Sequence, residues 1–284
     1  MSNEQLLITS KELAVLLQNS SPLHLFDCRF DLKQALWGHE QFIQGHIPSA
    51  VFIDLDHDLS GPKNPKKGRH PLPHPKQWMQ TRLKLGIALD DQVIIYDQAE
   101  NIFSARMWWM LKATGHTNVQ LLNGGFADWQ RFGGNLEVGE AVDRSRHEVE
   151  IHETPFANLV LMEDLQNLVN HPDHQIIDAR APERFKGEVE PLDPVAGHIP
   201  GAKNRPYQWN LEPNQLFKPA DVLKREFEIA KYAAKGLIHQ CGSGVTACHN
   251  LFAMTLAGLN GTKLYAGGWS EWCNHPENPV ATGN

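Results

Sequence analysis

A short loop near the C-terminal end of the sequence combines a potential nucleophile with backbone groups that stabilise anions. It follows an apolar run and leads into a helical pattern, in the order Cys241, Gly242, Ser243, Gly244, Val245 and Thr246. This order places the thiol at the carboxyl end of a parallel strand and beside a helix N-terminus, the usual ligand position of open α/β sheets. The positive helix end favours a thiolate, which is the nucleophilic form of a cysteine. We therefore predict that Cys241 is a nucleophile, although an inert buried thiol is the commonest role of a free cysteine.

The same loop predicts a cradle for an anion. Glycines at positions 242 and 244 let the backbone curl so that successive N–H groups point inward. We expect Gly242, Gly244, Val245 and Thr246 to bind the substrate through this backbone. Such a cradle suits a sulfur anion or an oxyanion.

The elements that position this loop occur twice in the chain, at an offset of about 151 residues. Four landmarks recur in the same order: LFDCR (25–29) and IIDAR (176–180), GHIP (45–48 and 197–200), the strands predicted at 93–97 and 236–240, and NGGFADW (123–129) and AGGWSEW (266–272). Four matches in one order indicate a duplicated domain.

Each copy alternates short β-branched runs with helical stretches, which is typical of a parallel sheet covered by helices. Strands are predicted at 119–122, 237–240 and 263–265, and helices at 105–113 and 247–257. We predict an α/β fold with two tandem domains, residues 1–145 and 159–284. A polar and charged linker, residues 146–158, connects them.

The two copies differ in the loop after the central strand. The first copy has DQAENIFS at 97–104, in which a final serine is the only hydroxyl or thiol. The second copy has Cys241 in this loop. The difference predicts a non-catalytic first domain and a catalytic second domain.

These segments resemble the tandem-domain rhodanese-like sulfurtransferases, and most of all the 3-mercaptopyruvate sulfurtransferases, over nearly the whole chain. The likeness lies in both GHIP segments and in SARMWWML, LLNGGFADW, GGWSEW and CGSGVTA. It implies that Cys241 attacks the sulfur of 3-mercaptopyruvate, releases pyruvate and keeps a persulfide. Cyanide, a thiol or a thioredoxin-like protein then accepts the outer sulfur.

The resemblance also implies roles for residues outside the loop. Arg184 matches the arginine that binds the donor carboxylate, whereas Leu192 stands where these enzymes usually carry a second arginine. Ser243 is expected to act in catalysis with His70 and Asp56. An exposed loop histidine and a turn or cap aspartate are the plainer interpretations of His70 and Asp56.

Three alternatives stay open on the sequence. A thiosulfate sulfurtransferase would use the same cysteine, although the neutral residues after Cys241 favour mercaptopyruvate over a small dianion. A cysteine phosphatase is disfavoured because Ala247 stands where a phosphate-binding arginine is required. A non-catalytic sulfur carrier or redox sensor would load Cys241 without turnover.

Several motifs have structural interpretations. Arg180 is expected to form an ion pair within its Asp-x-Arg motif, and the duplicated His46 and His198 are expected to bond backbone. The cationic segment at 61–69 is interpreted as a solvated loop that can raise the positive potential near the site. Cys248 is expected to pack inside a helix.

Composition narrows the function further. A formal net charge of -7 excludes the basic footprint of a general nucleic-acid binder. Four sparse cysteines indicate reduced thiols and a cytoplasmic location. The sequence contains no stretch of 18 apolar residues, so we predict no membrane span. The fifteen histidines lack the spacing that is typical of metal ligands. We expect no metal, no cofactor, no nucleic-acid or membrane partner, and a monomer.

Overall fold

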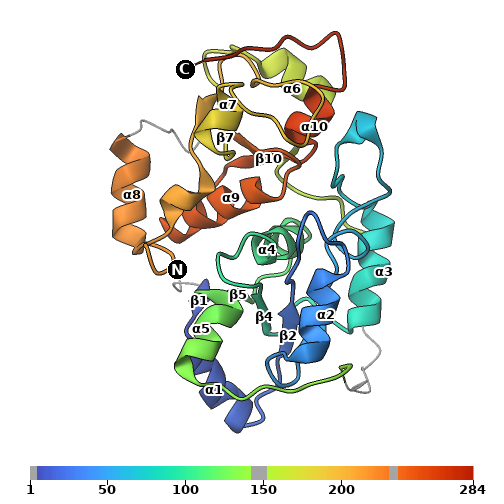
Figure 1. The fold of residues 1–284 in the computed structure, drawn as a ribbon, viewed down its shortest axis with the longest axis vertical. Helices are drawn as coiled ribbons and strands as arrows, with labels where there is room; N and C mark the ends of the chain where they lie inside the picture. The colour runs from blue at the N-terminus through green and yellow to red at the C-terminus, as the bar shows by residue number, and fades with distance from the viewer. Residues whose placement is uncertain (1–4, 142–151, 230–235, 284) are drawn as a thin grey trace. The chain divides into compact units, whose positions relative to one another are not determined.

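The computed structural model describes residues 5–141, 152–229 and 236–283. The chain divides into two compact units (Figure 1). The first comprises Met1–Leu59, Pro73–Ala157 and Pro213–Leu216, and the second comprises Ser60–Leu72, Asn158–Glu212 and Phe217–Asn284. Residues 146–151 of the predicted linker lie outside the described part of the chain.

The first unit is built on a five-stranded parallel sheet in the order β1-β5-β4-β2-β3. Its strands are β1 (Leu7–Ile8), β2 (His24–Asp27), β3 (Val51–Phe52), β4 (Val93–Tyr96) and β5 (Val119–Leu122). Its helices are α1 (Ser10–Gln18), α2 (Trp37–Gln44), α3 (Pro75–Leu85), α4 (Ser104–Ala113) and α5 (Gly125–Phe132).

The second unit repeats this topology in a parallel sheet of order β6-β10-β9-β7-β8. Its strands are β6 (Leu159–Val160), β7 (Gln175–Asp178), β8 (Lys203–Asn204), β9 (Leu237–Gln240) and β10 (Lys263–Tyr265). Its helices are α6 (Met162–Leu168), α7 (Pro182–Phe185), α8 (Ala220–Ile229), α9 (Thr246–Leu256) and α10 (Gly268–Trp272), with short 3₁₀ turns η1 (Pro65–Lys67) and η2 (Tyr207–Asn210). The predicted α/β fold with two duplicated sheets is confirmed.

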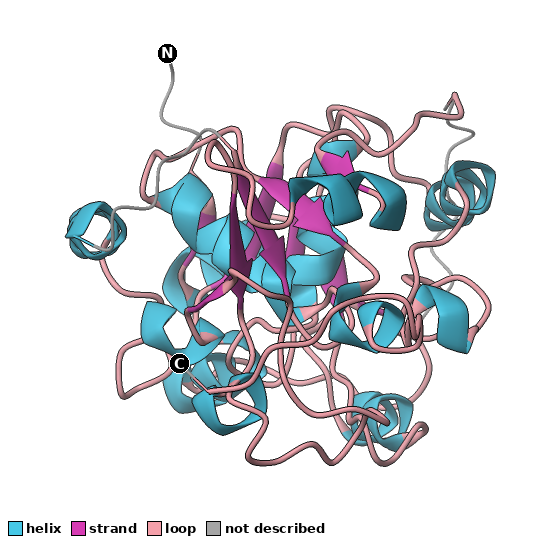
Figure 2. Cartoon of the chain, turned by 90° about the horizontal axis from the view of Figure 1, so that it is seen from above, coloured by secondary structure: helices cyan, strands magenta, loops and turns pink. Residues whose placement is uncertain are grey.

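Burial explains why the central strands read as apolar runs. Every residue of β4 and of β9 is buried, as expected for parallel strands covered by helices on both faces. Helices flank the strands (Figure 2), with α4 against β4 and β5, and α9 against β9 and β10. The start of α1 is stabilised by a capping box, in which the side chains of Thr9 and Glu12 each accept a hydrogen bond from the backbone N–H of the other.

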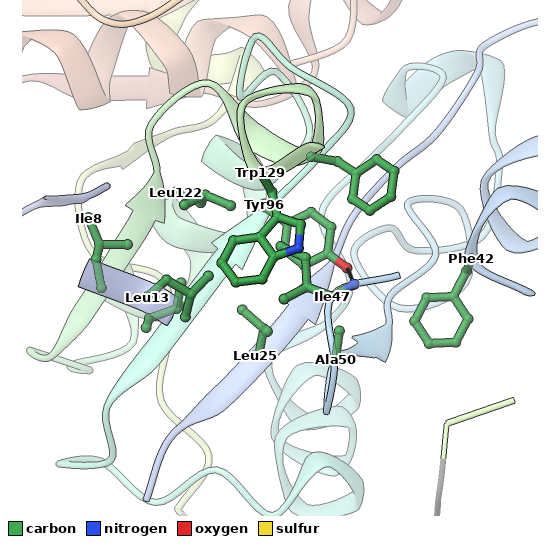
Figure 3. Close-up of a cluster of buried hydrophobic side chains, with 11 residues drawn as sticks. Ile8, Leu13, Leu25, Phe42, Ile47, Ala50, Tyr96, Leu122 and Trp129 are labelled. Atoms are coloured by element: carbon green, nitrogen blue, oxygen red, sulfur yellow. Dashed lines mark hydrogen bonds between the residues drawn. The ribbon is translucent and has the colours of Figure 1, made fainter. Parts of the chain in front are cut away.

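The core of the first unit forms around Tyr96 and Trp129 (Figure 3). The buried Tyr96 hydroxyl accepts a hydrogen bond from the Ile47 backbone N–H at 3.2 Å. Trp129 recurs in the second unit as Trp272, which is fully buried in the corresponding cluster. Both tryptophans therefore pack in the cores of their units. Among the described residues, no helix has the length and apolar character needed to cross a membrane.

Candidate active site

Cys241 directly follows β9 and lies in a tight loop that leads into α9. Its side chain is 2% exposed. Gly244 has a φ of +74°, and a methyl group at this position would lie 2.2 Å from the Ala266 carbonyl oxygen. Only glycine fits this close approach. The contact between the backbones of Gly244 and Ala266 therefore helps to fix the shape of the loop.

The segment AGGWSEW (266–272), the counterpart of NGGFADW in the first copy, packs against the cysteine loop. The backbone N–H groups of Trp269 and Ser270 donate to the carbonyl oxygens of Cys241 and Gly242, at 2.7 and 2.9 Å. Gly268 has a φ of +62°, and a methyl group there would lie 2.6 Å from the Cys241 carbonyl oxygen. This duplicated segment therefore fixes the backbone position of Cys241.

Ser243 and His70 meet within the second unit. The Ser243 hydroxyl lies 2.8 Å from His70 Nδ1, and both residues are buried, at 6% and 5% exposure. His70 belongs to the segment Ser60–Leu72, which packs with the second unit. The interpretation of His70 as an exposed loop histidine is therefore wrong.

Asp56 belongs to the first compact unit. Its backbone N–H donates to Asp54 Oδ1 at 2.8 Å within a turn after β3. Its expected action together with His70 and Ser243 stays a prediction.

Arg180 is a structural residue, as its Asp-x-Arg motif predicts. Its guanidinium donates to both carboxylate oxygens of Asp178 and to the Gly197 carbonyl oxygen at 2.7 Å. Burial lowers the pKa of Arg180, but the carboxylates of Asp178 and Glu190 outweigh it and hold the pKa above its ordinary value. His198 likewise bonds backbone, with Nδ1 2.8 Å from the Phe185 carbonyl oxygen.

Two further arginines lie beside the cysteine loop. A methyl group at Gly242 would lie 2.8 Å from Arg69 Nη2 and 3.5 Å from Arg184 Nη1. Both guanidiniums pair with Asp193, and Arg184 also donates to Glu190 Oε1 at 2.7 Å. Burial raises the pKa of Asp193, and its hydrogen bond from Arg69 opposes this shift.

The sequence pattern does not distinguish Arg69 from the lysines that precede it. Arg69 ends the cationic segment 61–69, for which the pattern predicts a solvated loop. Residues 62–67 are exposed, but Gly68 is buried and the Arg69 N–H donates to Ser270 Oγ at 3.0 Å. In the sequence, the only indication that Arg69 lies near the cysteine loop is its position directly before His70, because neighbouring residues must lie close together.

The remaining thiol and histidines near the loop are packed. Cys248 is fully buried in α9 and its thiol donates to the Gly244 carbonyl oxygen at 3.3 Å. Burial lowers the pKa of His239 to about 3, so its ring is neutral. In the described ranges, no three His, Cys, Asp or Glu residues are grouped to hold a metal ion.

Comparison with known proteins decides the family. The model of the rhodanese-like domain matches residues 9–132 and 161–275. The chain belongs to the rhodanese-like family. A Pseudomonas aeruginosa relative named as a 3-mercaptopyruvate sulfurtransferase is 43% identical over the whole of both chains. A Mycobacterium tuberculosis relative named as a thiosulfate sulfurtransferase is 37% identical over 98% of both chains.

A solved rhodanese-like structure agrees with this assignment. The crystal structure of the 3-mercaptopyruvate sulfotransferase SseA from Escherichia coli superposes on this chain with a TM-score of 0.79 and 32% identity. The match covers 93% of this chain and 99% of SseA. Both rhodanese-like sheets are therefore shared with a structure of the same family.

Proposed function

We propose that this chain is an enzyme that transfers the sulfur of 3-mercaptopyruvate to a thiol acceptor through a persulfide on Cys241. The observation that carries the proposal is the cysteine at the carboxyl end of a central strand, with the Ser243–His70 pair and Arg184 around its loop. The name of the Pseudomonas aeruginosa relative supports mercaptopyruvate as the donor.

The first step forms an S–S bond and breaks a C–S bond. The Cys241 thiolate attacks the sulfur of 3-mercaptopyruvate, and the electron pair of the broken C–S bond goes to the methylene carbon. The resulting enolate of pyruvate takes up a proton, and Cys241 carries a persulfide. Ser243, hydrogen-bonded to His70, polarises the donor carbonyl and relays a proton to the enolate oxygen. Asp56 is proposed to orient the imidazole.

The second step regenerates the thiolate. An acceptor thiolate or cyanide attacks the outer sulfur, the S–S bond breaks, and its electron pair returns to Cys241. The amides of Gly242, Gly244, Val245 and Thr246 are proposed to stabilise the anion in both steps. The acceptor class is a small thiol, cyanide or a thioredoxin-like protein. The cytoplasmic location, expected from the sparse cysteines, and the monomeric state both stay predictions.

Thiosulfate is the second candidate donor. The two guanidiniums beside Gly242 and the name of the Mycobacterium tuberculosis relative favour it. The neutral side chains at positions 242 and 243 favour mercaptopyruvate instead, because cationic side chains directly after the cysteine suit a small dianion.

Steady-state kinetics with both donors tests the assignment. We expect a higher kcat/KM for 3-mercaptopyruvate than for thiosulfate, with many equivalents of pyruvate released per enzyme when cyanide is present. A clear preference for thiosulfate would contradict the donor. Release of one equivalent of pyruvate and no more would instead indicate a sulfur carrier or redox sensor.

A further inference from the structure

Arg69 is held against the cysteine loop by contacts on both sides. Its backbone N–H donates to Ser270 Oγ at 3.0 Å. Before it, Gly68 has a φ of +88°, and a methyl group there would lie 2.5 Å from the Gly267 carbonyl oxygen. After it, His70 lies 2.8 Å from Ser243. The backbone of Arg69 is therefore fixed within the same unit as Cys241.

The two guanidiniums approach the same point of the loop. Arg69 Nη2 and Arg184 Nη1 both lie near the position that a side chain at Gly242 would occupy. Because Gly242 has no side chain, the guanidinium of Arg69 can lie against the backbone of the cysteine loop, 2.8 Å from the place that a Cβ atom would take.

Carboxylates orient these arginines while leaving donors for a ligand. Asp193 accepts from Arg69 Nη1 and from Arg184 Nη2, so Arg69 Nη2 and Arg184 Nη1 face the Gly242 side. Arg184 Nε is buried and has no hydrogen-bond partner among the described residues. The side chains are 28% and 18% exposed, so a ligand can reach them while water screens them only in part.

We propose that Arg69 joins Arg184 in a two-arginine clamp that binds the carboxylate of the sulfur donor, and so supplies the second cation that Leu192 does not. This inference rests on the proposed function for the identity of the donor. The two guanidiniums indicate an anionic group next to Cys241, and an arginine fork matches the carboxylate of 3-mercaptopyruvate at two points.

Alkylation of Cys241 tests the clamp without requiring turnover. Iodoacetate and iodoacetamide form the same Sγ–C bond and release iodide, but only iodoacetate carries a carboxylate. We expect Arg69→Gln to lower the rate constant for iodoacetate about 10-fold and to change the rate for iodoacetamide by less than about twofold. Peptide mapping assigns the modified residue, and Arg69→Lys should recover part of the loss because it keeps the charge.

Lys66→Gln is the matched control, since it removes one positive charge from an exposed side chain of the same segment. It should leave the ratio of the two rate constants unchanged. Equal slowing of both reagents in Arg69→Gln would overturn the clamp and leave Arg69 a structural residue. An unchanged iodoacetate rate would overturn it as well.

Turnover gives an independent readout on the donor. Mercaptoacetone is 3-mercaptopyruvate with a methyl group in place of the carboxylate. Arg69→Gln should lower kcat/KM for 3-mercaptopyruvate about 10-fold while leaving the rate of persulfide formation from mercaptoacetone nearly unchanged. If the wild type used neither donor, the proposed function would fail, whereas the alkylation ratio would still decide the clamp.

Discussion

The loop after β4 and the loop after β9 begin at equivalent positions in the two duplicated sheets. Tyr96 pairs with Asp27, and Gln240 pairs with Asp178 in the same register, so Asp97 and Cys241 are counterparts. The first loop reaches its helix at Ser104 and the second at Thr246, so the first is two residues longer.

The support beneath the two loops is nearly identical. The Phe126 N–H donates to the Asp97 carbonyl oxygen at 2.8 Å, as the Trp269 N–H does to that of Cys241 at 2.7 Å. Gly125, like Gly268, would place a methyl group 2.6 Å from that carbonyl oxygen. The scaffold alone therefore does not distinguish the copies.

The difference lies in what fills the turn. The Asp97 carboxylate accepts hydrogen bonds from four backbone N–H groups of its own loop: Ala99, Asn101, Phe103 and Ser104. The first copy thus satisfies its anion-binding amides with its own side chain. The second copy has a thiol at this position and glycines after it, which leaves the turn for a sulfur anion. If the proposed function holds, this difference accounts for one copy of the fold being structural and the other reactive.

The largest expected effect is the removal of the thiol of the second copy. Cys241→Ser should lower sulfur transfer by roughly four orders of magnitude or more, because a hydroxyl does not form the persulfide. Cys28→Ser makes the same chemical change in the first copy, where the thiol is buried against Met107. Its kcat should stay within about twofold of the wild type. An equal loss of sulfur-transfer activity in both variants would contradict the assignment of the reactive thiol to the second copy.

A matched pair of glycine substitutions is the next test. Gly268→Ala and Gly125→Ala both introduce a methyl group at positive φ against a carbonyl oxygen, and each should destabilise its unit by about 2 kcal/mol. Only Gly268→Ala displaces Cys241, so kcat/KM should fall roughly 10- to 100-fold in that variant. Thermal unfolding measures the shared effect, and donor kinetics measures the specific one. A similar loss of activity in Gly125→Ala would contradict the separation.

A smaller effect is expected from Ser243→Ala, which gives the second loop the residue that the first has at Ala99. Turnover of 3-mercaptopyruvate should fall about 10-fold, because the donor loses the hydroxyl that His70 orients. Discharge of a preformed persulfide by cyanide should be unaffected. The double variant Ser243→Ala/His70→Ala should lose no more than the larger single loss; additive losses would separate the two residues.

The smallest effect on catalysis is expected from a substitution of Asp97, whose carboxylate accepts hydrogen bonds from the backbone of its own loop in the first copy. Burial raises the pKa of Asp97 from 3.8 to about 6, and the four N–H donors oppose this shift. Because the folded pKa lies above the unfolded one, the stability from Asp97 is full below about pH 4 and is lost as pH rises through 6. Relative to Asp97→Asn, the wild type should lose about 3 kcal/mol of unfolding free energy across this window. Denaturant unfolding at several pH values measures the difference; a pH-independent gap would contradict it.

The duplicated fold and the place of the cysteine were predictable because both rest on local patterns. Apolar runs, glycine stops and the repeated landmarks gave the sheet, and the Asp-x-Arg ion pair and the backbone-bonding histidine of GHIP follow the same repeat. The role of Arg69 was not predictable in this way. It depends on a contact with Ser270 across 201 residues, and the surrounding lysines read as an ordinary solvated loop.

The hydrogen bonds between the Asp97 carboxylate and the backbone of its own loop were not predictable from the sequence either. The absence of a nucleophile in residues 97–104 predicted an inactive copy, but no pattern indicated that the carboxylate would collect the amides of its own loop. That arrangement depends on φ and ψ angles along the loop, including the positive φ of 60° at Asn101, which residue types alone do not specify.

The central claim is that Cys241 carries sulfur, and the mass of the intact protein tests it most directly. After exposure to 3-mercaptopyruvate and rapid desalting, the wild type should gain the mass of one sulfur atom, and cyanide or dithiothreitol should remove it. Cys28→Ser should gain the same mass and Cys241→Ser should gain none. A wild type that gains no sulfur, or a Cys241→Ser variant that gains as much, would contradict the account.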